Sequence, residues 1–238
     1  MPEWYHELNE DLWLPPDEQG EEEARFIRRA LRLRNGHRVL DVPCGAGRVA
    51  VHLAQAGCSM TGADIRRAFV SRARKRFREA GVKGEFVVLD MRETDWSCEF
   101  DGIYVWNGSF GYFDDEANAD VVLRLARALR PGGRLLVEQP NRERILRDFR
   151  REVVTEKRVS RNRWNRRRQR VESSYFVGGV HDPRDRSSMR LYTPRQMRDL
   201  YERAGLAVER VYGDLRGSLY SRSGQKMIFV GRKLRPAN

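Results

Sequence analysis

Short apolar runs alternate with amphipathic segments along the first 140 residues of this 238-residue chain. The runs have the length of buried strands, whereas the segments between them repeat apolar positions every three or four residues, as helices do. The predicted order is strand 38–42, helix 47–56, strand 58–63, helix 67–80, strand 84–88, strand 101–105, helix 115–129 and strand 133–139. Strands that alternate with helices favour βαβ crossovers, so the pattern predicts an α/β fold with a mostly parallel sheet.

The pattern differs before and after this region. Residues 1–35 contain two apolar helical segments separated by Pro15-Pro16, which predicts an N-terminal helical cap. After residue 142, the runs 171–177 and 188–192 alternate apolar and polar residues, as half-exposed strands do. We therefore expect an inserted antiparallel β flap in this part of the chain.

The last segment returns to the pattern of the first region. Thr193 and Pro194 are a typical N-cap and first helical residue, and Gly205 ends the predicted helix. Two apolar runs follow, and we expect them to complete one edge of the sheet. The chain is thus divided into an N-terminal helical cap at 1–35, a ligand-binding core at 36–141, a basic flap over the substrate site at 142–192, and a C-terminal helix and strands at 193–238.

The first predicted strand runs directly into a glycine-rich turn. Gly45 and Gly47 have no Cβ, so the backbone there can adopt positive φ and approach a ligand closely. The spacing from Gly45 through Gly47 to Ala50 satisfies the dinucleotide fingerprint, with Asp64 as the acid about twenty residues on. A match of this kind is weak by itself, so an NAD-type oxidoreductase is one hypothesis among several.

Five motifs in the same order resemble the class I S-adenosylmethionine-dependent methyltransferases over residues 36–139. The first is Asp41 with the glycine loop Pro43-Cys44-Gly45-Ala46-Gly47, the second is the acid Asp64 at the end of the second strand, and the third is Asp90-Met91-Arg92 after the third strand. The fourth is the loop 107–113 after the fourth strand, and the fifth is the segment 129–137 around Pro131-Gly132-Gly133. The resemblance implies a Rossmann-like, doubly wound, mostly parallel seven-stranded sheet and S-adenosyl-L-methionine as cofactor.

The resemblance also implies roles for individual residues. Asp64 would accept hydrogen bonds from both ribose hydroxyls, and Asp90 would accept one from the adenine amine. Asp41 would order the loop, and an aromatic residue of the cap, Tyr5, would close over the donor. The family's first loop glycine falls on Pro43, which has no N–H to donate. The predicted cofactor-binding residues are Tyr5, Asp41, Pro43, Gly45, Gly47, Asp64, Ile65, Asp90, Met91 and Asn107.

The implied reaction is an in-line displacement in which an acceptor atom attacks the sulfonium methyl group. Alignment supplies most of the catalysis, and a base is needed only if the acceptor must lose a proton. His181 and Tyr112 are the predicted catalytic residues; the unperturbed pKa of histidine suits a base at neutral pH. Arg142, Tyr175 and Arg190 are the predicted substrate-binding residues.

The composition of the chain says more about its cellular location than about its reaction. No run reaches the roughly 18 apolar residues of a membrane span, and three widely spaced cysteines indicate neither disulfides nor a zinc site. We therefore expect a cytoplasmic protein and assign no metal-ligating residues, while metal dependence is left open. The net charge is +12, but only five of the 46 basic residues are lysine, an imbalance that genome composition can produce without a nucleic-acid partner.

These observations favour transfer of a methyl group to an oxygen or nitrogen of a small molecule, such as a sugar, a sugar nucleotide or a natural product. No Asn/Asp-Pro-Pro-Tyr/Phe motif follows the fourth strand, which argues against enzymes that methylate adenine or glutamine amides. Flap arginines could bind an anionic group of the acceptor. The alternatives are an RNA methyltransferase that uses the basic insertion and a non-catalytic S-adenosylmethionine-binding module.

Overall fold

The computed structural model describes residues 17–156 and 158–234, except for the side chains of 181–185. Helices and strands follow one another as η3 (Asp17–Gln19), α1 (Gly20–Ala30), β1 (Arg38–Asp41), α2 (Ala50–Gln55), β2 (Ser59–Asp64), α3 (Arg67–Glu79), β3 (Gly84–Val88), η4 (Met91–Glu93), β4 (Phe100–Val105), α4 (Asp115–Ala128), β5 (Leu129–Pro140), α5 (Arg142–Arg147), β6 (Glu152–Val154), β7 (Val159–Asn165), β8 (Arg170–Val177), β9 (Val180–Arg190), α6 (Pro194–Arg203), β10 (Leu206–Tyr212) and β11 (Lys226–Lys233). The predicted cap residues before Asp17 lie outside the described part of the chain.

The main sheet has seven strands in the order β10-β11-β5-β4-β1-β2-β3. Strands β1 to β5 pair in parallel, and β11 pairs antiparallel with both β5 and β10. This arrangement confirms the predicted doubly wound, mostly parallel α/β sheet. The strand order reverses between β1 and β4, and ligands of such sheets bind outside the carboxyl ends of the strands near that point.

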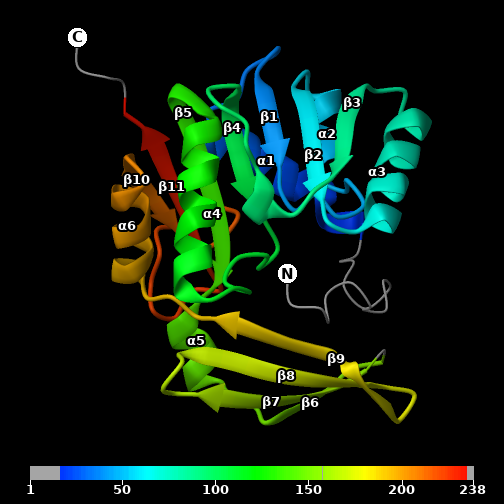
Figure 1. The fold of residues 1–238 in the computed structure, drawn as a ribbon, viewed down its shortest axis with the longest axis vertical. Helices are drawn as coiled ribbons and strands as arrows, with labels where there is room; N and C mark the ends of the chain where they lie inside the picture. Colours follow the sequence, from blue (N-terminus) through cyan, green and yellow to red (C-terminus); the bar gives the residue numbers. More distant parts are fainter. Residues whose placement is uncertain (1–16, 157, 235–238) are drawn as a thin grey trace.

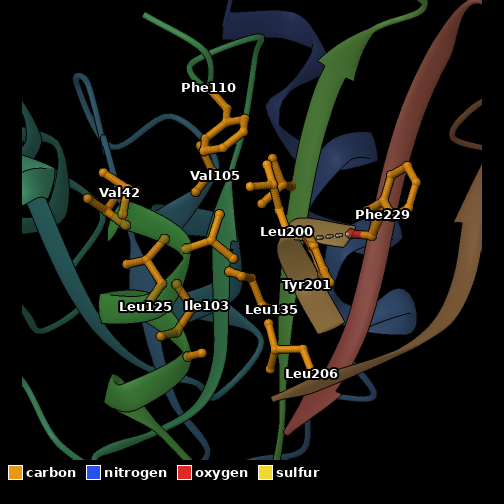
Figure 2. Close-up of a cluster of buried hydrophobic side chains, with 14 of the residues drawn as sticks. Val42, Ile103, Val105, Phe110, Leu125, Leu135, Leu200, Tyr201, Leu206 and Phe229 are labelled. Carbon is orange, nitrogen blue, oxygen red and sulfur yellow. Dashed lines mark hydrogen bonds between the residues drawn. The ribbon is translucent and has the colours of Figure 1, made fainter. Parts of the chain in front are cut away.

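Helices cover both faces of the sheet (Figure 1). On one face, α4 and α6 enclose an apolar cluster that includes Val42, Leu125 and Tyr201 (Figure 2), and the Tyr201 hydroxyl donates to the carbonyl oxygen of Phe229 at 3.4 Å. On the other face, α1, α2 and α3 enclose a second cluster that includes Phe26. Since both faces are buried, the central strands are continuous apolar runs, which is why their positions could be predicted from the sequence.

The helix ends follow local rules. The Thr193 hydroxyl accepts from the Gln196 N–H, and the Gln196 side chain accepts from the Thr193 N–H, so α6 begins with a complete capping box. At α4, the Asp114 side chain accepts from the Ala117 N–H, which is an N-cap without the reciprocal bond. By contrast, the helix predicted from residue 47 begins only at Ala50, because Gly47 has φ +72° and belongs to a turn.

The flap is a separate antiparallel sheet in the order β6-β7-β8-β9. It lies beyond the carboxyl ends of the core strands, below them in Figure 1, with β9 as the strand nearest the core. The sequence predicted only two of its strands. It missed β7 because that strand places Ser160 and Asn162 where apolar residues would mark a half-buried face. It also missed the short helix α5 that leads into the flap.

Within the described ranges, no helix is long and apolar enough to cross a membrane.

Candidate functional site

The loops after β1, β2, β3 and β4 meet at one edge of the main sheet. Four of the predicted cofactor-binding residues line a single pocket there, together with Tyr112 from the loop after β4. The pocket lining consists of Val42, Pro43, Ile65, Leu89, Asp90, Met91 and Tyr112. Segments that are distant in sequence thus form one small, mostly apolar pocket with a carboxylate at its wall.

The glycine loop is fixed by the end of the neighbouring strand. The Cys44 N–H donates to the carbonyl oxygen of Ala63 at 2.8 Å, and the Gly45 N–H donates to Asp64 Oδ2 at 2.9 Å. These two bonds hold the residues directly after Pro43, so the loop is anchored without the N–H that proline lacks. Gly47 has a different role, because a Cβ there would lie 3.1 Å from the Cβ of Ala73 on α3.

Asp64 lies at the carboxyl end of β2 and is 1% exposed. Its second oxygen accepts from the Arg66 N–H at 2.9 Å, so one carboxylate connects the glycine loop and the start of α3. Burial raises the pKa of this carboxyl group to about 6, although the N–H groups of Arg66 and Gly45 stabilise the charge. A group with this pKa changes charge just below neutral pH.

Asp41 lies behind the loop rather than at the pocket. It is 3% exposed, and burial raises the pKa of its carboxyl group far above the ordinary value. The Tyr104 hydroxyl opposes that shift, the nearby charge of Asp64 adds to it, and Arg48 opposes it. This position suits the predicted role of ordering the loop.

Asp90 already uses its carboxylate within the protein. It accepts from the Arg92 N–H at 2.9 Å and pairs with the Arg92 guanidinium at 2.8 Å, and it caps η4. Arg92 in turn lies over the Phe113 ring, 4.8 Å from its centroid. An adenine amine would therefore share Asp90 with Arg92, whereas Ile65 and Met91 offer apolar sides to a flat ring in the same pocket.

Asn107 begins a tight turn after β4. Asn107 and Gly108 both have positive φ, at +59° and +67°. The Gly108 N–H donates to Glu138 Oε2 at 2.6 Å, and Lys226 Nζ lies 3.3 Å from the other Glu138 oxygen. The buried Glu138 therefore supports this turn from β5, which explains its position better than a role as a free base.

Tyr112 connects the donor pocket and the flap. Burial raises the pKa of its phenol well above the ordinary value, and the neighbouring Tyr175 and Glu138 raise it further. A phenol that keeps its proton at neutral pH is a poor general base but can donate a hydrogen bond.

Arg170 of β8 clamps the loop around Tyr112. Its guanidinium donates to the carbonyl oxygens of Phe113 at 2.7 Å and of Gly111 and Tyr112 at 2.9 Å each. It also donates to the carbonyl oxygen of Ser188 at 2.7 Å. One side chain of the flap thus fixes three successive residues of the site loop, a role that the sequence did not reveal.

We expect the substitution Arg170→Met to loosen this loop without unfolding the chain. The loss of hydrogen bonds from a charged donor to these carbonyl groups lowers local stability by about 2 kcal/mol, which corresponds to roughly 30-fold faster amide exchange. Hydrogen exchange read by mass spectrometry over residues 109–114 measures this change. Arg168→Met is the matched control, because Arg168 lies in the adjacent exposed turn and its side chain forms no hydrogen bond or ion pair with the described residues. Equal exchange in the two variants would contradict the clamp.

One face of the flap is turned toward this site. A Cβ at Gly108 would lie 3.7 Å from Met189 Cε, and Arg142 of α5 lies 5.7 Å from the centroid of the Trp164 ring. On the same face, the Tyr175 hydroxyl lies 2.7 Å from Ser187 Oγ. Met189, Trp164 and Tyr175 thus present an uncharged wall to the core.

The predicted arginines are held by other protein groups. Arg190 is 6% exposed; its Nε donates to Asp115 Oδ1 at 3.0 Å, and its Nη1 donates to the carbonyl oxygen of Leu191 at 3.1 Å. Arg142 bonds to the side-chain oxygen of Gln169 in addition to contacting Trp164. These contacts connect the flap to α4 and α5, and contact with a substrate stays a prediction for both arginines.

Of the two remaining predicted residues, Tyr5 and His181, the structure describes only the backbone of His181. Tyr5 lies outside the described residues. The backbone of His181 pairs with Phe176 near the β8–β9 turn, nine residues along β9 from Arg190, or about 30 Å at 3.4 Å per residue. The described backbone therefore does not bring His181 to the end of β9 that contacts the site loop.

A buried ion pair behind the glycine loop also escaped the sequence analysis. Arg48 follows the loop, and its Nη2 lies 2.6 Å from Oε2 of Glu23 on α1. Both side chains are less than 9% exposed. Nearby, Arg76 Nε donates to the carbonyl oxygen of Ala46 at 3.0 Å and also pairs with Asp17. Neither pair could be predicted, because the partners come from elements without a shared motif.

Comparison with known proteins agrees with this arrangement. A methyltransferase-domain family model matches residues 39–133. The methyltransferase GfsG of Streptomyces halstedii is 33% identical over 127 residues, which cover 52% of this chain and 45% of that protein. The chain spans about half the length of the curated relatives it matches.

Solved structures extend the likeness to nearly the whole chain. The CcbJ methyltransferase of Streptomyces caelestis has a TM-score of 0.79 at 17% identity, covering 94% of this chain and 96% of that one. CalS10 of Micromonospora echinaspora, described as an amino pentose methyltransferase, has a TM-score of 0.59 at 22% identity and covers 91% of each chain. At these identities the likeness establishes the fold.

Proposed function

This chain belongs to the class I S-adenosylmethionine-dependent methyltransferases, and we propose that it transfers a methyl group to an oxygen or nitrogen of a small molecule. S-adenosylmethionine is the cofactor of this family. The observation that carries the proposal is the single pocket that joins the glycine loop, the loops after β2 and β3, and Tyr112.

The residues present fit the adenosine part of this cofactor. Asp64 is a buried carboxylate at the strand end where a ribose diol would donate hydrogen bonds. Ile65 and Met91 supply apolar sides for a flat ring, and Asp90 supplies an acceptor at its edge. Gly45, at φ +51°, keeps the loop free of a side chain next to Asp64. We assign these residues to the nucleoside and leave Asp41 to the support of the loop.

When bound, the cofactor supplies a methyl group on a sulfonium, which a nucleophile displaces in line. The protein's part is chiefly alignment, which can contribute up to about 7–11 kcal/mol toward such a bimolecular step. The Arg170 clamp and the Glu138 support hold the loop 107–113 in one conformation, so that an acceptor meets a fixed wall. Tyr112, which keeps its proton, would orient the acceptor as a hydrogen-bond donor rather than deprotonate it.

The side chains that face the core suggest what kind of acceptor fits. Hydroxyl and amide groups are paired there, Tyr175 with Ser187 and Asn162 with Ser173, beside the Trp164 ring. Such groups suit a hydroxylated or amine-bearing molecule, for example a sugar or a natural product. CalS10, which acts on an amino pentose by its description, is consistent with this class.

A labelling experiment tests the proposal. The protein is incubated with S-adenosylmethionine that carries a deuterated methyl group and with a fractionated small-molecule extract, and products are read by mass spectrometry. We expect a labelled small molecule that disappears with Asp64→Asn. Binding of the cofactor without any labelled product would favour the non-catalytic module, and label confined to an RNA fraction would favour the RNA methyltransferase.

A further inference from the structure

The alternation of side chains along the flap strands separates charged from neutral residues. Successive residues of a strand point to opposite faces. Within the described parts of β7, β8 and β9, the face with Trp164, Tyr175 and Met189 has no arginine. The opposite face has Arg161, Arg163, Asn165, Arg170, Glu172, Ser174, Arg186, Ser188 and Arg190. The basic charge of this part of the flap therefore lies mainly on the face opposite Trp164, Tyr175 and Met189, and two of its arginines, Arg170 and Arg190, contact the core.

The strand register places three of these residues in one row. Arg161 pairs with Ser174, and Ser174 pairs with Arg186 on its other side. A hydroxyl is thus flanked by two exposed arginines on strands about 4.8 Å to either side. Guanidinium and hydroxyl groups are the donors that proteins most often direct at phosphate oxygens.

The basic surface continues beyond this row to the turn between β7 and β8. Arg167 and Arg168 lie in that turn, and with Arg161, Arg163 and Arg186 they line one open cleft of about 1090 Å³, which residues 112–115 of the core and Glu172 also line. The seven residues of β7 alone extend about 24 Å. The charge is therefore spread along a stripe, as a chain of phosphates requires, rather than focused on one point.

Part of this charge is not neutralised by the protein. Arg161 pairs with Glu152, and Arg163 pairs with Glu172. In contrast, the exposed side chains of Arg167, Arg168 and Arg186 form no hydrogen bond or ion pair with any described residue. These three guanidinium groups are available to an anion.

We propose that this arginine-bearing face of the flap binds the phosphate backbone of a single-stranded nucleic acid. A protein partner is less well suited, because interface cores are depleted of charge and rich in aromatic groups, whereas this face is charged. Phe176, which lies on the same face, is covered by the Arg161 guanidinium at 4.5 Å, so it offers no free ring for a base to stack on. Binding therefore depends on the backbone and is independent of base sequence.

The cleft lies beside the site loop. The neutral face contacts Gly108 and α5, whereas the face with the arginines contacts the loop through Arg170, and Tyr112 lines both the donor pocket and the cleft. The inference does not depend on the proposed function, since its readout is binding.

Fluorescence anisotropy with labelled 12-nucleotide RNA and DNA of one sequence tests the proposal on the full chain. We expect equal affinity for both, and a triple variant R167Q/R168Q/R186Q that raises Kd at least tenfold at about 50 mM salt. Each phosphate contact contributes about 0.7 to the slope of log K against log salt for single strands, so the slope should fall by about 2.

The matched control is R34Q/R67Q/R78Q, which removes the same charge from exposed arginines of the core. A change of less than threefold in this variant supports a site on the flap, and an equal loss in both variants would overturn it in favour of diffuse attraction to a basic protein. Competition by polyglutamate as strong as by RNA of equal charge would also overturn it, in favour of an acidic protein partner.

Discussion

Replacement of Asp64 by asparagine is expected to weaken binding of S-adenosylmethionine at least tenfold while leaving the fold intact. The asparagine oxygen can still accept from the Gly45 N–H at 2.9 Å, so the loop keeps its anchor, whereas the bond from the Arg66 N–H is lost because an amide nitrogen only donates. What is lost is the negative charge toward the ribose hydroxyls, and hydrogen bonds to a charged acceptor contribute about 1.5–3 kcal/mol. Titration calorimetry measures the affinity, and Asp95→Asn, an exposed carboxylate, is the control.

The same residue gives this prediction a pH dependence. The pKa of Asp64 is about 6 in the folded chain, above the ordinary value of 3.8. The folded state therefore holds the proton more tightly than the unfolded state, so the stabilisation from Asp64 is complete below about pH 4 and is lost as pH rises through 6. Ribose hydroxyls favour the ionised form, so the affinity for the cofactor should change in the opposite direction.

We accordingly expect the wild-type affinity to fall up to tenfold per pH unit below 6, and the profile of Asp64→Asn to be flatter. An unchanged Kd in this variant would show that the ribose is not placed at the end of β2. A pH profile shared by both proteins would mean that another group controls binding.

The second large effect concerns the ion pair between Arg48 and Glu23. Arg48→Met is expected to destabilise the chain by about 3–5 kcal/mol, because it leaves the Glu23 carboxylate buried without its counter-charge. For a chain of this size, that corresponds to a decrease in Tm of roughly 6–20 °C. Urea unfolding followed by circular dichroism measures the change. Arg25→Met, which breaks an exposed pair with Glu21, should cost less than about 1 kcal/mol.

A double variant distinguishes the pair from simple packing. Removing both charges in R48M/E23L should restore most of the lost stability, since two apolar groups do not require a buried counter-charge. If the double variant is as unstable as the two single changes combined, the side chains act independently and the ion pair is not the cause.

The sequence predicted the core with little error because its signals are local. Strand 84–88 and the first residue of α3 were placed correctly, since apolar periodicity and glycine joints are read within a few residues. The flap was predicted less completely. β7 alternates arginines with serine and asparagine, so its pairing partners on β8, rather than its own pattern, make it a strand.

The candidate site residues also differ between the core and the flap. The pocket unites Pro43, Ile65, Asp90 and Met91, because each follows a strand whose carboxyl end lies at the same edge of the sheet. The arginines did not follow this logic. Arg190, for which substrate binding stays a prediction, pairs with Asp115, while Arg170 was overlooked although it holds the site loop.

The sequence by itself determined the order of strands and helices, the glycine loop and the acids that follow the strands. These features depend on chemistry within one loop or one period of a helix. Only the tertiary structure decided how Arg170 and Arg48 are paired, what raises the pKa of Asp64, and which face of the flap has the arginines. Those properties depend on strand register and on burial among residues that are 19 to 59 positions apart, and no local pattern encodes such distances.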